Sequence, residues 1–294
     1  MSPAQTGIQL VTPATGQGAA VAGVVVLALL FMGGTLNVRW LIWWKRNPGW
    51  PRRAFRRLRH RPWTGHNAAG IFAVAALLYA AATLGGLALH QAGSMPGSPL
   101  VTAIVMTAVL HLGIVAAVLM GVRRERIAWR AAFGRPRALR REGTIAAAGY
   151  AAMLPAVFLL TLLAHAALRA ANIPPRPQAV LTVFMGGGIP LWLRVLLMLT
   201  AVITAPLAEE LLFRGILLPV LLKHWGTVVA ILLSSALFAV LHGNLTAFLP
   251  LMAAATAFAA GYAATGSIWT PVLMHALFNA ASLALLLAAG GLPV

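Results

Sequence analysis

The sequence predicts an all-α, polytopic transmembrane helix bundle with about eight spans. Three observations lead to this fold class. Hydrophobic residues make up 61% of the 294-residue chain, the mean hydropathy is +0.88, and only 9% of the residues are charged. A soluble globular domain carries about 25% charged residues, and a disordered chain is poor in apolar residues. Both classes are therefore excluded, and with no cysteine in the chain there is no disulfide framework.

Apolar stretches long enough to cross a bilayer recur along the whole chain. The expected spans cover roughly residues 19–36, 67–89, 100–122, 144–168, 191–222, 227–242, 246–264 and 268–288. The first is preceded by no positive charge, so it is expected to be an uncleaved span and not a signal peptide. The fifth is too long for an upright span, and we expect it to tilt or to kink at Pro206.

Charge sets the expected orientation. Sixteen of the 22 Lys and Arg residues lie in residues 45–61 and 123–142, and the positive-inside rule places both segments in the cytoplasm. We expect the first half of the second segment to be either a helix lying flat on the anionic inner leaflet or a solvated basic loop. Both termini then lie outside, in an integral protein of a bacterial plasma membrane. The net charge of +18 is explained in this way without a nucleic-acid partner.

The chain divides into three parts by composition. Residues 1–18 form a short polar N-terminal segment, and residues 19–170 are expected to be accessory transmembrane helices with the two basic cytoplasmic loops. Ionisable residues within apolar stretches are costly and therefore mark functional sites. The convergent set of them occurs after residue 190, so residues 191–290 are expected to be the catalytic core.

The first polar group is Glu209-Glu210-Leu-Leu-Phe-Arg214. On a helix, Glu210 and Arg214 are four residues apart and face each other, whereas Glu209 is rotated by about 100°. Arg214 can therefore neutralise Glu210 while Glu209 faces elsewhere. Two neighbouring carboxylates in a low dielectric do not both ionise easily, which suits one of them to act as a general base or acid.

Two further groups follow, Phe238-Ala-Val-Leu-His242 and His275-Ala-Leu-Phe-Asn279. In each motif, the side chains of the first and last residues lie one helical turn apart on the same face of the helix. Counting about 1.5 Å per residue, we expect Glu209, His242, His275 and Asn279 to converge below the outer surface, in a cavity approached from the inside.

A carboxylate and a histidine can hold and deprotonate a water, and a second histidine with an amide can donate to an oxyanion. These groups can hydrolyse an acyl bond without a covalent intermediate. Alternatively, Glu209, His242 and His275 could bind a divalent metal such as zinc that activates the water. The zinc motif His-Glu-x-x-His is absent, and Asn is a poor zinc ligand, so no cofactor is favoured.

These three motifs, in this order, resemble those of the CAAX prenyl protease and bacteriocin-processing (CPBP) family of intramembrane proteases. All positions of the family pattern are present here, within about residues 191–290: Glu-Glu-x-x-x-Arg, Phe-x-x-x-His and His-x-x-x-Asn. The resemblance implies an intramembrane endopeptidase in which Glu209 and His242 activate water. His275 and Asn279 would form the oxyanion hole, and Glu210, Arg214 and Phe238 would support the site.

The implied substrate is a membrane-anchored protein or peptide, including the prenylated CAAX type that eukaryotic relatives process. The family has been described both as metal-dependent and as glutamate-dependent, and the residue set favours the second. Two other functions remain open at this point. Buried Glu, Arg and His also suit a transporter or proton relay, and the fold could serve a non-catalytic immunity or scaffold protein.

Overall fold

The computed structural model describes residues 16–92, 99–136, 138–178, 183 and 190–288. Within these residues the only regular secondary structure is helix, without a strand, which confirms the predicted fold class. Most of the polar segment 1–18, most of the loop expected at 91–99 and the glycine run 186–188 lie outside the described residues. The helices are α1 (Gly16–Arg46), α2 (Trp50–Arg59), α3 (Gly65–Gln91), α4 (Pro99–Arg124), α5 (Trp129–Phe133), α6 (Leu139–Ala170), α8 (Leu191–Leu199), η1 (Thr200–Thr204), α9 (Ala205–Glu210), η2 (Leu211–Leu217), α10 (Leu218–His224), α11 (Thr227–Leu241), α12 (Leu245–Thr265) and α13 (Trp269–Ala288).

Seven helical segments in the described part of the chain are long and apolar enough to cross a membrane. The expected sixth span corresponds to α11, which has only 15 residues. At 1.5 Å per residue it is about 22 Å long, whereas the hydrocarbon core is about 30 Å thick. Helix α11 is therefore too short to cross the hydrocarbon core upright. His242, at its end, lies short of the membrane surface that a full span would reach.

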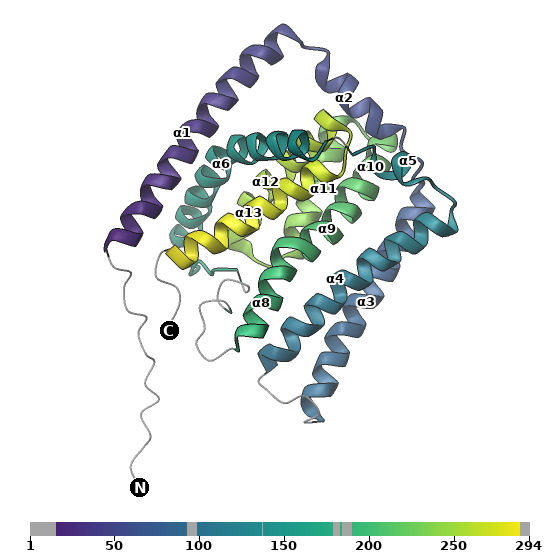
Figure 1. Ribbon diagram of the computed structural model, residues 1–294, viewed down its shortest axis with the longest axis vertical. Coiled ribbons are helices and arrows are strands. Elements are labelled where there is room, and N and C mark those ends of the chain that lie inside the picture. The colour runs from purple at the N-terminus through teal and green to yellow at the C-terminus, as the bar shows by residue number, and fades with distance from the viewer. Residues whose placement is uncertain (1–15, 93–98, 137, 179–182, 184–189, 289–294) are drawn as a thin grey trace.

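The helices are arranged around a central group formed by α8 to α13 (Figure 1). Helix α1 packs along α6, which in turn packs against α12 and α13. On the other side the hairpin α3–α4 packs against α8 and α9 through α4. Helices from residues 19–170 therefore contact the expected catalytic core directly, and α6 continues unbroken past Pro155.

The long fifth segment, Leu191–His224, alternates between α-helical and π-helical turns. The π-helical stretches η1 and η2 each precede a proline, Pro206 in α9 and Pro219 in α10. Proline has no N–H to donate to the preceding turn, and π-turns are frequent at functional sites. These irregular turns flank the Glu209-Glu210 pair on both sides.

All four segments expected on the inner side meet at one end of the bundle, which we call the basic end. It comprises α2, α5 and the turns at residues 223–226 and 265–268. Basic side chains there donate to carbonyls at helix C-termini: Arg57 to Ala263, Arg59 to Leu222 and Arg61 to Gly266. Positive charge is favourable at a helix C-terminus because of the helix dipole, so these arginines join the helix ends.

The segment around α5 exposes its arginines, as a basic loop would, but the end of α5 is packed into the core. Phe133 is fully buried, with its ring 5.6 Å from that of Trp63, and its carbonyl accepts a hydrogen bond from the N–H of Ile268. A Cβ on Gly215 would lie 2.6 Å from the Phe133 ring, so only glycine permits this contact. The segment is therefore docked into the core, because its aromatic residues bury apolar area there.

The opposite end of the bundle contains the connection 171–178 and the reversal at 242–244, both expected on the outer side. The two are joined directly, since the Asn244 side chain donates to the carbonyls of Arg176 and Pro177 at 3.2 and 3.0 Å. Asn244 also caps α12 by accepting from the N–H of Ala247. The structure thus separates the two predicted faces consistently, whereas the side on which each faces the cell remains a prediction.

Candidate active site

The two adjacent glutamates face different environments, as the helical spacing predicts. Glu210 is fully buried, and its Oε1 lies 2.9 Å from Nη1 of Arg214. Glu209 is partly exposed and lines a cavity. The sequence expectation that Arg214 neutralises only one of the two carboxylates is met in this geometry.

Arg214 is held by two hydrogen-bond acceptors and by aromatic rings. Its guanidinium donates to Glu210 and to the carbonyl of Ala255 at 3.0 Å. Its Cζ lies 4.6 Å from the ring centre of Phe238 and 5.3 Å from that of Phe258. A buried charge requires such pairing and contact with aromatic faces to remain ionised, so the predicted supporting residue Phe238 belongs to this network.

The buried pair extends to a histidine on another helix. Nδ1 of His275 lies 3.0 Å from Oε1 of Glu210, and its ring stacks on Phe258 with ring centres 5.0 Å apart. A carboxylate only accepts hydrogen bonds, so Nδ1 of His275 carries the proton. Its other nitrogen, Nε2, then faces Glu209.

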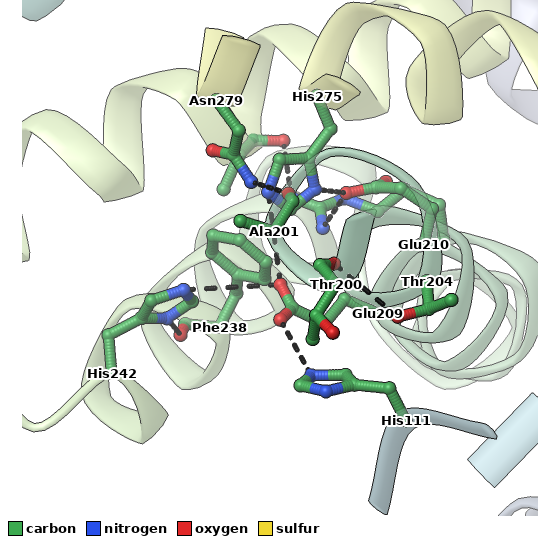
Figure 2. A network of polar contacts seen from close by, with 12 residues as sticks. His111, Thr200, Ala201, Thr204, Glu209, Glu210, Phe238, His242, His275 and Asn279 are labelled. Carbon is green, nitrogen blue, oxygen red and sulfur yellow. Dashed lines mark hydrogen bonds and ion pairs between the residues drawn. The ribbon is translucent and has the colours of Figure 1, made fainter. Parts of the chain in front are cut away.

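Three histidines surround the Glu209 carboxylate (Figure 2). Oε1 lies 3.5 Å from Nε2 of His111, and Oε2 lies 3.9 Å from Nε2 of both His242 and His275. Within the described residues, Oε2 is buried without a hydrogen-bond partner. Because the 3.9 Å separations are too long for direct hydrogen bonds, this is where a water molecule could bridge the groups.

All three imidazoles are oriented in the same way. Nδ1 of His111 donates to the carbonyl of Thr107 at 2.7 Å, and Nδ1 of His242 donates to that of Phe238 at 2.8 Å. His275 uses Glu210 as its acceptor. Since these acceptors have no proton to give, every Nδ1 is protonated, and each ring turns its Nε2 toward Glu209.

His111 is the site residue that the sequence reading missed. It lies on α4, outside the three motifs, in an otherwise apolar helix. A histidine in that setting is more often a packed residue bonded to a backbone carbonyl, and His111 does make that bond. Its intramembrane position was a signal of function, but nothing in the sequence indicates which helix packs beside Glu209.

Asn279 has a partner that the sequence did not indicate. Its Nδ2 donates to the carbonyl of Ala201 at 2.7 Å. In the π-helical turn η1 the N–H of Ala205 bonds to the carbonyl five residues earlier, so the carbonyl of Ala201 would be paired with the nitrogen of Pro206. Proline has no N–H, and the Asn279 amide satisfies this acceptor with one of its two hydrogens.

The site opens into a cavity of about 400 Å³. Its lining includes Thr107 and His111 from α4, Thr200 and Ala201 from η1, and Ser282 from α13. Most of the wall is apolar, with Glu209, His242, His275 and Asn279 as its convergent polar groups, a composition typical of binding sites. The lining residues come mainly from the helix halves away from the basic end. The expected approach from the inside of the cell stays a prediction, because the fold alone does not assign the two ends to compartments.

A metal ion would require at least three suitable side chains converging on one point. Among the described residues, no group of three or more His, Asp or Glu side chains is arranged so that it could hold one. This includes the set Glu209, His242 and His275 that the sequence offered as alternative zinc ligands. We therefore derive no step through a metal, and metal dependence remains a matter for experiment.

A further glutamate is buried outside this site. Glu142, expected in a basic loop, lies in the first turn of α6 and is hydrogen-bonded by the hydroxyl of Thr270. The contact joins the start of α6 to the start of α13.

Comparisons with known proteins find matches for the part of the chain that contains most of these residues. The family described as "Type II CAAX prenyl endopeptidase Rce1-like" matches residues 190–281. The resemblance to the CPBP family is confirmed for this segment. A relative from Bacillus subtilis (strain 168), named "Putative membrane peptidase YdiL", is 33% identical over 84 residues, which are 29% of this chain and 34% of that protein. The chain thus matches about a third of that relative's length, and no solved structure matches the chain significantly.

The matched segment contains Glu209, Glu210, Arg214, Phe238, His242, His275 and Asn279. It leaves out α4, and therefore His111 and Thr107. The cavity is completed by residues that lie outside the family match.

We predict that Arg214→Met strongly destabilises the protein, because it leaves Glu210 buried without its cation. Breaking a buried pair in this way costs about 3–5 kcal/mol. Thermal unfolding in detergent should show a lower midpoint than for the matched control Arg169→Met, at an exposed position near the end of α6.

The double variant Glu210→Gln/Arg214→Met removes both charges and should recover part of the loss. An Arg214→Met protein that unfolds at the wild-type temperature would show that the pair does not support the fold.

Proposed function

We propose that this protein is an intramembrane endopeptidase that hydrolyses a peptide bond of a membrane-associated protein or peptide with water activated by Glu209. The observation that carries the proposal is the convergence of three histidine Nε2 atoms on one carboxylate, at 3.5–3.9 Å, in a largely apolar cavity. The CPBP match and the relative named as a membrane peptidase support the same reaction class.

Water activation is the first step. A water placed between Oε2 of Glu209 and the Nε2 atoms of His242 and His275 would donate to the carboxylate and to one imidazole. Glu209 accepts a proton as the water oxygen attacks the carbonyl carbon of the substrate. His242 is already aligned for this role, because the Phe238 carbonyl fixes its Nδ1–H and leaves the Nε2 lone pair available.

The developing oxyanion requires donors. Asn279 retains one amide hydrogen after its bond to Ala201, and it lies on the cavity wall. His275 can donate through Nε2 only as an imidazolium, whose charge the Glu210 carboxylate beside it would balance. A pair of donors fixed in this way before the reaction lowers the barrier by electrostatic stabilisation.

The leaving amine must receive a proton when the carbon–nitrogen bond breaks. Glu209 holds the proton taken from water, and His111 contacts its other oxygen, Oε1. Transfer from Glu209 through His111 to the amine nitrogen balances the reaction, since water supplies one oxygen and two hydrogens to the two products. His111 is therefore the proposed acid for the leaving group.

Glu209→Gln should reduce cleavage below detection while leaving the fold intact. Glutamine has the same shape but cannot accept a proton from water. His242→Ala should be nearly as damaging, whereas Asn279→Ala should lower kcat on the order of 10²–10³-fold, as for one oxyanion donor. A panel of membrane-tethered peptide reporters, incubated with purified protein in detergent, provides the measurement.

The matched control is Glu125→Gln, at an exposed glutamate beyond α4, which should cleave normally. If Glu209→Gln cleaves at the wild-type rate, this site is not the protease site. If no variant and no wild-type preparation cleaves any reporter, the proton relay and the non-catalytic scaffold become the better assignments.

His111→Ala should lower kcat on the order of 10²–10⁴-fold, as expected when a general acid is removed. The loss should be smaller for a reporter whose scissile amide is replaced by an activated ester, because such a leaving group needs no proton. His90→Ala, at an exposed histidine on α3, is the control. Equal losses on amide and ester would instead indicate that His111 only positions Glu209.

Activity should survive dialysis against a strong chelator, and the active preparation should contain no stoichiometric zinc. The proposed reaction uses only side-chain proton transfer, so chelation removes nothing that it requires. Elemental analysis and rate measurement before and after dialysis provide the readout. Loss of activity that zinc alone restores would make Glu209, His242 and His275 the metal ligands.

A further inference from the structure

We propose that the catalytic cavity is entered from the end of the bundle opposite the basic end, so that the substrate is a peptide segment presented on the outer face of the membrane. That the entering molecule is a protease substrate depends on the proposed function, whereas the direction from which it enters depends on the fold alone.

The cavity lies in the half of the bundle away from the arginines. On α4, on the continuous helical segment Leu191–His224 and on α12, which run from the outer end toward the basic end, the lining includes residues of the first half: Thr107, Leu197 and Leu251. On α13, which runs the other way, the lining continues to the late residues Ser282 and Leu283. In helices of both directions, the lining residues therefore extend toward the same end of the molecule, the one opposite the basic end.

Segments of that end border the cavity. Gln178, at the end of the connection 171–178, is one of the lining residues. His242 lies at the reversal that Asn244 joins to this connection, and its side chain is 26% exposed, more than that of Glu209 or His275. The reactive groups are therefore most open toward this end.

The route from the basic end is filled. Five large side chains between Arg214 and the arginines have no exposed surface: Leu58, Trp63, Phe133, Ile216 and Ile268. Arg61 ties the helix ends together above them by donating to the carbonyls of Gly266, Arg130 and Ala131. A close-packed layer of this kind has no room for a peptide.

Charge then assigns the two ends to compartments. The basic end contains residues 45–61 and the described part of 123–142, which hold most of the Lys and Arg of the chain, and such segments remain in the cytoplasm. The cavity accordingly opens toward the outer face. A peptide anchored on the inner leaflet cannot reach Glu209, whereas an exported peptide or the outer juxtamembrane segment of a membrane protein can.

Single-cysteine labelling tests this directly, because the native chain has no cysteine. Ser282→Cys and Thr107→Cys report on the cavity, Ala171→Cys on the outer connection, and Ala138→Cys on the basic end. Each variant is treated with a sulfonated, membrane-impermeant maleimide in right-side-out and in inside-out vesicles. Both cavity cysteines and Ala171→Cys should react only in right-side-out vesicles, and Ala138→Cys only in inside-out vesicles.

Cavity labelling that follows Ala138→Cys, occurs from both sides or fails from both sides would overturn the proposal. Labelling of Ala171→Cys and the cavity together from the cytoplasmic side would overturn the assignment to the outer face. Neither result depends on proteolysis, so the entry direction can fail while the Glu209 assignment stands. Conversely, if the Glu209→Gln variant cleaves at the wild-type rate while the cavity is labelled from the outer side, only the protease assignment fails.

Discussion

The buried interaction of Glu210 with Arg214 is the constraint on which the rest of the site depends. A carboxylate and a guanidinium without exposure are stable only if each is paired and hydrogen-bonded. Their remaining contacts draw in α12 through the Ala255 carbonyl and α13 through His275. Three helices are thereby fixed around Glu209, whose own carboxylate is left turned toward the cavity.

The irregular helix geometry before Pro206 supports the same arrangement of side chains around Glu209. Pro206 deprives the carbonyl of Ala201 of a backbone partner, and Asn279 from α13 supplies one. An unpaired carbonyl would be costly at membrane depth, so the polar side chain both satisfies the backbone and reaches the cavity. In the proposed reaction its second amide hydrogen faces the oxyanion, which links a local backbone defect to the chemistry.

The two ends of the bundle are built in different ways. At the basic end, arginines donate to the carbonyls that terminate α10 and α12, and Phe133 closes the core beneath them. At the other end, α11 stops after 15 residues and its reversal is held by Asn244. Irregular backbone within a membrane is tolerated where it lines a cavity, and the proposed direction of entry follows from this asymmetry.

The sequence by itself determined the helical spans, the Glu210–Arg214 pair and the divergence of Glu209, because contacts four residues apart on a helix follow from its periodicity. The three motifs also placed His242, His275 and Asn279 in one candidate site. Only the tertiary structure decided that His111 joins them, that Phe133 is buried and that the cavity faces away from the arginines. These depend on which helices pack together, and apolar helices with nearly uniform faces contain little information about their neighbours.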